Sequence, residues 1–138
     1  AREQVGSVLG TIQSVLGGIA GISLLVAGIG IINTMTVTVM ERTKEIGTMK
    51  AIGARSTDIM FLFLNEAAIT GLVGGSIGAI FGFGLGIAIG RYVDISVTPT
   101  LSLGLYTVGF ALITSVLSGI YPAWRASNLD PVEALRRE

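Results

Sequence analysis

The chain has 138 residues, of which 51% are hydrophobic and 13% are charged, and its formal net charge is zero. A soluble domain usually carries about 25% charged residues, so this composition argues against a soluble globular protein. Cysteine and histidine are both absent, which excludes thiol chemistry and removes the commonest general base and metal ligand. We therefore expect neither a catalytic residue nor a metal site in this chain.

Three long stretches of the sequence, 4–40, 67–90 and 95–124, contain no charged residue. A helix needs about 20 mostly apolar residues to cross the hydrocarbon core of a bilayer. The pattern predicts an all-α integral membrane bundle in which nearly the whole chain is helix. The three membrane spans are expected at about residues 18–40, 59–92 and 101–120.

The first uncharged stretch is too long for a single crossing, because 37 helical residues would reach about 55 Å against a core of about 30 Å. Its early part has two faces, one apolar and one carrying Gln4, Ser7, Thr11 and Ser14. We therefore predict an extracytoplasmic stalk helix over residues 4–17. Because the chain opens outside the membrane without an initiator methionine, we also expect a further span upstream.

The connector between the first two spans predicts a short amphipathic helix at about residues 41–54, ended by Gly53. Its apolar side chains recur every third residue, at Ile46, Met49 and Ile52, while most charged side chains fall elsewhere. Such a helix either lies on the membrane surface or docks onto a soluble partner, with a solvated basic loop as the alternative.

The second span carries a ladder of glycines spaced four residues apart, with Gly71 and Gly75 as a second, offset pair. On a helix this spacing makes a groove in which another helix can approach closely. Packing within the chain's own bundle and contact with a second subunit are equally open interpretations. The ladder consists of Gly74, Gly78, Gly82, Gly86 and Gly90.

Glu66 is the single acidic residue within a predicted span, about 12 Å along the helix from Asp58. Intramembrane acids are candidates for function. We favour an interfacial or paired carboxylate, with a proton or substrate role as the alternative.

The third span is followed by a short C-terminal helix predicted at about residues 131–137. Asp130 is placed as its N-cap, and Pro131 occupies the first helical position. Tyr121 and Trp124, just after the span, fit the headgroup layer of the membrane.

Basic residues are distributed unequally between the two sides of the predicted spans. Seven lie in the first connector or after the last span, and two, Arg2 and Arg91, lie on the opposite side. The positive-inside rule therefore predicts that residues 41–58 and the C-terminus are cytoplasmic, with the N-terminus of the chain and residues 91–100 outside.

Three parts of the sequence resemble the permeases of type VII ABC transporters, the FtsX-like or MacB-type family. They are the run ERTKEIGTMKAIGA at 41–54, the glycine-rich span that follows, and YPAWRASNLDPVEALR at 121–136. The resemblance starts at about Gly18 and implies a permease with four spans, of which this chain supplies the last three. It also implies that residues 41–54 are a coupling helix that docks onto an ATPase. The implied coupling residues are Arg42, Glu45, Ile46, Gly47, Met49, Lys50 and Ile52.

Such a permease is not itself an enzyme, because ATP and Mg²⁺ are bound by the ATPase. The resemblance implies mechanotransmission, in which the spans relay ATP-driven motion to an extracytoplasmic domain for efflux or extraction of drugs, peptides or lipoproteins. Expected partners are the ATPase, a second permease copy in a homo- or heterodimer, the lipid bilayer and a periplasmic adaptor, but no nucleic acid. The expected location is the inner membrane of a prokaryote. The alternatives are an FtsX-like regulator of an external enzyme, or a small channel or proton-coupled carrier that uses Glu66.

Overall fold

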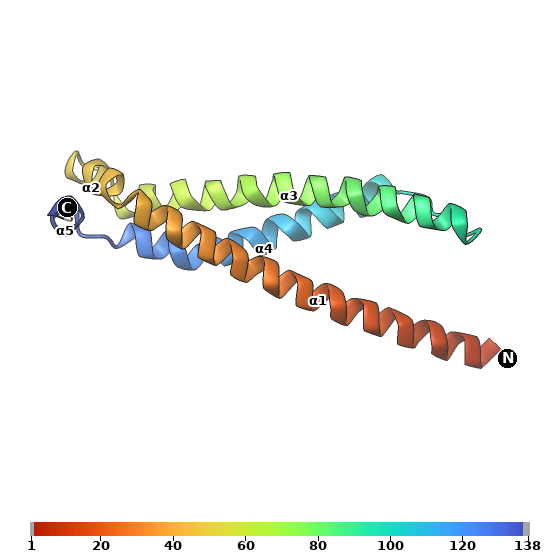
Figure 1. The fold of residues 1–138 in the computed structure, drawn as a ribbon. Coiled ribbons are helices and arrows are strands. Elements are labelled where there is room, and N and C mark those ends of the chain that lie inside the picture. The colour runs from red at the N-terminus through yellow and green to blue at the C-terminus, as the bar shows by residue number, and fades with distance from the viewer. Residues whose placement is uncertain (1, 137–138) are drawn as a thin grey trace.

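The computed structural model describes residues 2–136, and all the regular elements among them are α-helices (Figure 1). Three of the helices are long and apolar enough to cross a membrane. The predicted all-α membrane bundle with three long helices is therefore confirmed. The helices are α1 (Arg2–Glu41), α2 (Thr43–Ala51), α3 (Ser56–Tyr92), α4 (Leu101–Ser127) and α5 (Pro131–Arg136).

α1 is one continuous helix of 40 residues, about 60 Å long, that covers both the expected stalk and the expected first span. Its hydroxyl groups bond back to the preceding turn, as when Thr11 Oγ1 donates to the Ser7 carbonyl at 2.9 Å. Figure 1 shows α1 diverging from the other long helices toward its N-terminal end. The division into a stalk at 4–17 and a span at 18–40 stays a prediction.

α3 and α4 form an antiparallel hairpin, joined by residues 93–100, with the most extensive helix–helix contact in the structure. Small residues allow the close approach: a Cβ placed at Gly71 would lie 2.7 Å from Ser115 Cβ and 2.9 Å from Leu112 Cα. At the same level the buried Ser115 Oγ donates a 2.6 Å hydrogen bond to the Ala67 carbonyl. Such a bond between helices satisfies a polar group that lipid cannot satisfy.

The buried core lies at one end of the bundle, where the C-terminal end of α1 meets the start of α3 and the end of α4. Phe63, Ala123 and Ala126 are completely buried there. The core also contains side chains from α1, α2 and α3, namely Met35, Val39, Ile46, Ile59 and Ala67. The bundle is therefore tied together at the end that carries α2 and α5.

α4 continues seven residues beyond the expected end of the third span at residue 120. It passes through Pro122, which has no N–H to donate to the carbonyl of Ser118. Pro122, Ala123 and Ala126 are all buried in the core end of the bundle. Tertiary packing of this last part of α4 compensates for the hydrogen bond that the proline removes.

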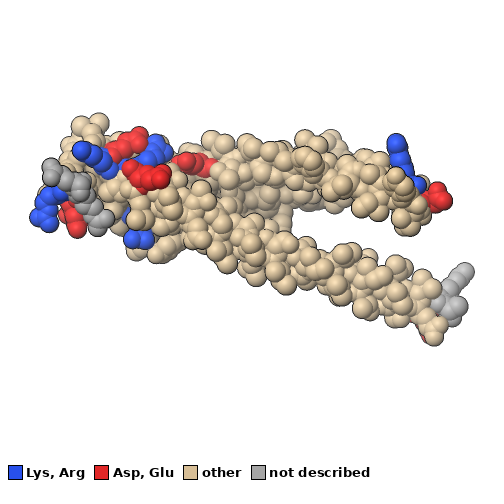
Figure 2. All heavy atoms as spheres, in the orientation of Figure 1, with Lys and Arg blue, Asp and Glu red and all other residues tan. Residues whose placement is uncertain are grey.

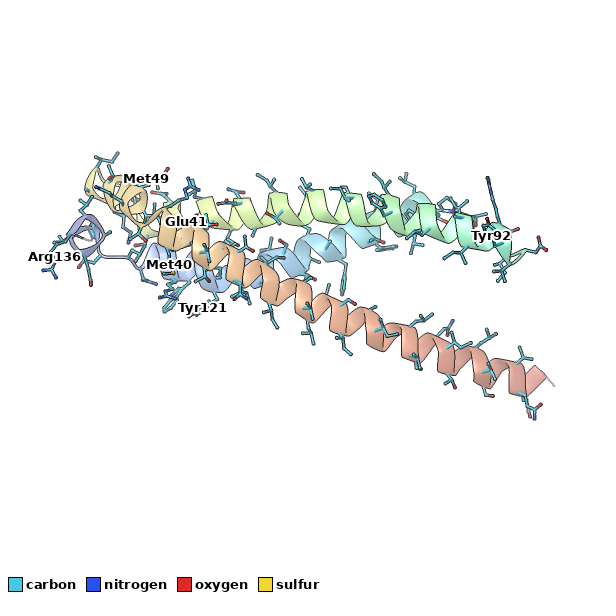
Figure 3. All side chains as sticks on the ribbon, viewed as in Figure 1. Met40, Glu41, Met49, Tyr92, Tyr121 and Arg136 are labelled. Carbon is cyan, nitrogen blue, oxygen red and sulfur yellow. The ribbon has the colours of Figure 1, made fainter. Side chains whose placement is uncertain are left out.

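The surface separates into charged ends and an uncharged middle, as a membrane protein requires. Figure 2 shows most charged side chains gathered at the end with α2 and α5, a smaller group at the far end of α3, and uncharged surface between them. Figure 3 places Tyr121 near the α2 end and Tyr92 at the opposite end of the hairpin. Aromatic residues at both ends of an apolar band match the two interfaces of a bilayer.

Candidate functional site

The amphipathic helix predicted between the first two spans is α2, which follows α1 after one non-helical residue, Arg42. Its C-terminal end is a Schellman motif, in which Gly53 adopts a left-handed φ of 108°. The Ala54 N–H donates to the Met49 carbonyl and the Gly53 N–H to the Lys50 carbonyl, at 3.0 and 3.1 Å. The prediction that Gly53 ends this helix is confirmed.

The structure corrects the expected orientation of the apolar side chains on α2. Ile46 is 1% exposed and belongs to the chain's own core, so it is not a surface anchor for a partner. Met49 is half-buried, whereas Ile52 is 82% exposed. The sequence spacing placed these three residues on one stripe, but Ile52 lies at the C-cap, where the helix ends and its side chain turns away from the core.

The buried face of α2 packs against α5, the short C-terminal helix. A Cβ placed at Gly47 would lie 2.8 Å from Ala134 Cβ, so only glycine allows α5 to approach this closely. Asp130 caps α5 as predicted, because its Oδ1 accepts a 2.9 Å hydrogen bond from the Val132 N–H. The predicted end of this helix at residue 137 lies outside the described residues.

Lys50 connects α2 to the C-terminal end of α4. Its Nζ donates to the carbonyls of Ser127 and Leu129, at 2.5 and 2.9 Å. Ser127 is buried and Lys50 is half-buried, so the ammonium group lies partly inside the α2–α4–α5 junction. Lys50 was expected among the coupling residues, but nothing in the sequence indicated these two acceptors.

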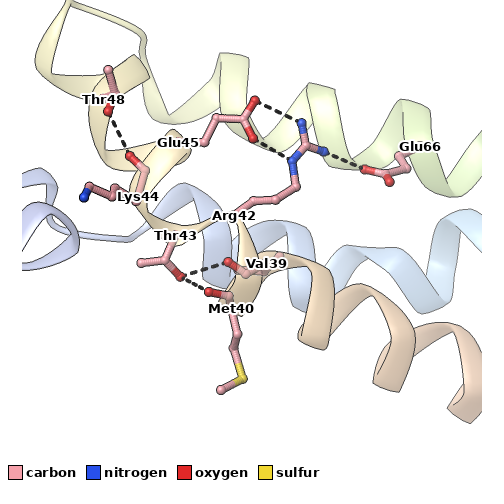
Figure 4. Close-up of polar contacts among 8 residues, drawn as sticks. All are labelled: Val39, Met40, Arg42, Thr43, Lys44, Glu45, Thr48 and Glu66. Atoms are coloured by element: carbon pink, nitrogen blue, oxygen red, sulfur yellow. Dashed lines mark hydrogen bonds and ion pairs between the residues drawn. The ribbon is translucent and has the colours of Figure 1, made fainter. Parts of the chain in front are cut away.

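Arg42 pairs with acidic residues from two helices (Figure 4). Its Nε and Nη2 donate to Glu45 at 2.8 and 3.2 Å, and its Nη1 lies 3.6 Å from Glu66 Oε2. The hydrogen bond from Arg42, together with its charge, lowers the pKa of Glu45, and the same hydrogen bond raises the pKa of Arg42. The geometry agrees with the paired interpretation of Glu66.

The glycine ladder divides into two groups in the structure. A Cβ at Gly74, Gly78 or Gly82 would meet no other atom within 4 Å, so this part of the ladder is open. Gly86 and Gly90 face the loop after α3, where a Cβ would lie 3.8 Å and 2.8 Å from the methyl groups of Val97. Among residues 2–136, α3 packs against α4 through the offset pair, Gly71 and Gly75, whereas a Cβ added at any ladder glycine would meet no atom of another helix within 4 Å.

A cavity of about 150 Å³ lies beside the α2–α4–α5 junction, between the ends of α1, α4 and α5. Its lining is mixed and includes the apolar Val39 together with Arg125 and Glu133. Residues 2–136 contain no group of three acidic, histidine or cysteine side chains placed to hold a metal ion. The candidate site is therefore the surface formed by α2, α5 and the adjoining helix ends.

Three membrane-length helices with a short helix docked across one end define a multi-pass helical membrane protein. The family of FtsX-like permease C-terminal domains matches residues 17–131, and the chain belongs to this family. This confirms the family indicated by the resemblance.

Individual relatives align with nearly the whole chain. It is 42% identical over 137 residues to the macrolide export ATP-binding/permease protein MacB of Bdellovibrio bacteriovorus, covering 99% of this chain and 21% of that protein. It is 46% identical over 128 residues to the pyoverdine export ATP-binding/permease protein PvdT of Pseudomonas syringae pv. syringae, covering 93% and 19%. An uncharacterized ABC transporter permease of Methanocaldococcus jannaschii is 39% identical over 142 residues, with 99% and 36% covered. The chain thus spans about a fifth to a third of the length of these relatives.

Proposed function

We propose that this chain is the C-terminal membrane part of a type VII ABC export permease. In this proposal α2 is the coupling helix that receives motion from an ATPase, which binds ATP and Mg²⁺. The spans relay that motion to an extracytoplasmic domain for efflux or extraction of drugs, peptides or lipoproteins. The relatives named as ATP-binding/permease export proteins support an ATPase partner.

The observation that carries this proposal is the placement of α2. One face of the helix is fixed to the bundle through Ile46 and Gly47, while Lys44, Thr48 and Ile52 are exposed. A helix that is anchored on one side and open on the other can transmit a push or a pull to the helices that hold it. The 82% exposed Ile52 is an apolar side chain that a partner would cover.

The exposed surfaces of the long helices support two further partners, the lipid bilayer and a second permease copy. Large apolar side chains such as Leu25, Phe81 and Leu117 are 61–69% exposed along α1, α3 and α4, which suits a lipid environment. The open part of the ladder, Gly74, Gly78 and Gly82, provides a face for a helix of a second permease copy. The excess of basic residues on the α2 side supports a cytoplasmic α2 and C-terminus in a prokaryotic inner membrane.

The test is the substitution Ile52→Asp in the full-length permease together with its ATPase. Burying a carboxylate at a contact that held an apolar anchor should reduce ATPase binding by more than about tenfold and stop export. Val93→Asp provides the matched control, because Val93 is 59% exposed at the other end of α3. Wild-type ATPase retention and export by Ile52→Asp would end the assignment of α2 as the coupling helix.

A further inference from the structure

α2 is covalently continuous with α1 and α3, yet its side chains contact the C-terminal part of the chain. It packs more extensively on α5 than on α1. Gly47 lies against Ala134, where a Cβ would come within 2.8 Å, and within 3.5 Å of the Pro131 carbonyl. A movement of α2 therefore displaces α5 directly.

Lys50 supplies hydrogen bonds that the C-terminal end of α4 cannot obtain from its own backbone. The Ser127 carbonyl would ordinarily be bonded by the N–H four residues later, but that residue is Pro131, which has none. Leu129 lies in the turn before α5, and its carbonyl also accepts from Lys50 Nζ. A cation at this place also interacts favourably with the negative end of the α4 dipole.

α4 packs extensively against both of the other long helices. A Cβ at Gly119 would lie 2.6 Å from Ala67 Cβ on α3 and 3.2 Å from Met35 Sδ on α1. Ser115 Oγ adds the hydrogen bond to the Ala67 carbonyl. A displacement of α4 is therefore passed to α1 and α3 together.

We infer that Lys50 is a positioning residue that clamps α2 to the end of α4, so that α2, residues 128–130 and α5 move with α4 as one body. Motion arriving at α2 then enters the bundle through α4, in addition to the covalent connections to α1 and α3. The transmission of motion through α4 rests on the proposed function of α2, whereas the attachment of α2 to the end of α4 by Lys50 does not.

The test compares Lys50→Met with Lys44→Met in the full-length permease with its ATPase. Both substitutions remove one lysine charge from the same helix, but Lys44 is exposed and makes neither of the Lys50 contacts. Lys50→Met should accelerate amide hydrogen exchange across residues 128–136 by at least about tenfold, since it removes two hydrogen bonds donated by a charged group. Lys44→Met should leave that exchange unchanged, and Lys50→Arg should restore much of the protection.

The coupling of ATP hydrolysis to export is measured as the number of ATP molecules hydrolysed per molecule exported. The resemblance implied that Lys50 contacts the ATPase, but its ammonium group bonds within the chain. Lys50→Met should therefore keep ATPase binding but raise this ratio several-fold, and weakened ATPase binding by Lys50→Met would overturn its assignment as a positioning residue. Unchanged exchange at 128–136 would overturn the clamp, and faster exchange with a wild-type ratio would overturn its role in coupling. Failure of the proposed function would be seen separately, as normal ATPase binding by Ile52→Asp.

Discussion

The substitution Gly71→Ala should separate α3 from α4. The added Cβ would lie 2.7 Å from Ser115 Cβ, 2.9 Å from Leu112 Cα and 3.1 Å from the Ala111 carbonyl oxygen. Carbon atoms pack at about 3.5–4.0 Å, so the two helices must move apart by about 1 Å. Two of these three neighbours are backbone atoms, which cannot rotate away as a flexible side chain would.

The expected change in the free energy of unfolding has two sources, overpacking between the helices and the loss of a hydrogen bond. Overpacking of this kind costs about 1–3 kcal/mol. A shift of about 1 Å also breaks the 2.6 Å hydrogen bond from Ser115 Oγ to the Ala67 carbonyl. A hydrogen bond between membrane helices contributes about 0.6 kcal/mol on average. We expect Gly71→Ala to lower the free energy of unfolding by about 2 kcal/mol.

The assay is unfolding in mixed micelles by titration with sodium dodecyl sulfate. Helicity is followed by circular dichroism and the packing of α4 by the fluorescence of Trp124, the single tryptophan of the chain. Gly74→Ala is the matched control, because it adds the same methyl group to the same helix where nothing lies within 4 Å. It also carries the same gain in helix propensity, so the difference between the two variants isolates the packing cost. Equal stability of Gly71→Ala and Gly74→Ala would refute the packing of α3 on α4 described above.

Three further outcomes are expected. Single cysteines introduced at Thr48 and Ser96 should react with an impermeant reagent from opposite faces of the membrane, and labelling from one face would contradict the three-span topology. Replacing Gly78 and Gly82 together by leucine should leave monomer stability nearly unchanged but weaken self-association in detergent, and unaltered association would show that this face contacts lipid. Lowering the pH should remove the contribution of the Arg42–Glu45 pair: since the folded-state pKa of Glu45 is depressed, the contribution is complete above the ordinary glutamate pKa and lost as the pH falls through the lowered value. Because the pair is exposed, the corresponding loss in Glu45→Gln at neutral pH should be small, and a large loss would mean that the carboxylate is buried in the assembled protein.

The sequence alone determined the features that depend on local pattern. Uncharged stretches long enough to cross a bilayer specified the three long helices, because an unpaired charge in lipid is costly. Gly53 marked the end of α2, since a left-handed residue is needed there, and Asp130 marked the start of α5. The 41–54 run, in combination with the C-terminal run, also indicated the permease family to which the chain belongs.

Only the tertiary structure decided which side of each helix is buried and against what. The ladder from Gly74 to Gly90 has the same spacing of four as the offset pair, Gly71 and Gly75, and is longer, yet the pair is what packs on α4. Helical periodicity shows that two glycines share a face, but it does not show where a neighbouring helix lies. In the same way, the stripe of Ile46, Met49 and Ile52 indicated an amphipathic helix without showing that the chain's own core buries Ile46 and leaves Ile52 exposed. The bonds from Lys50 to Ser127 and Leu129 join positions 77 and 79 residues apart, a relation that the fold creates and local sequence does not encode.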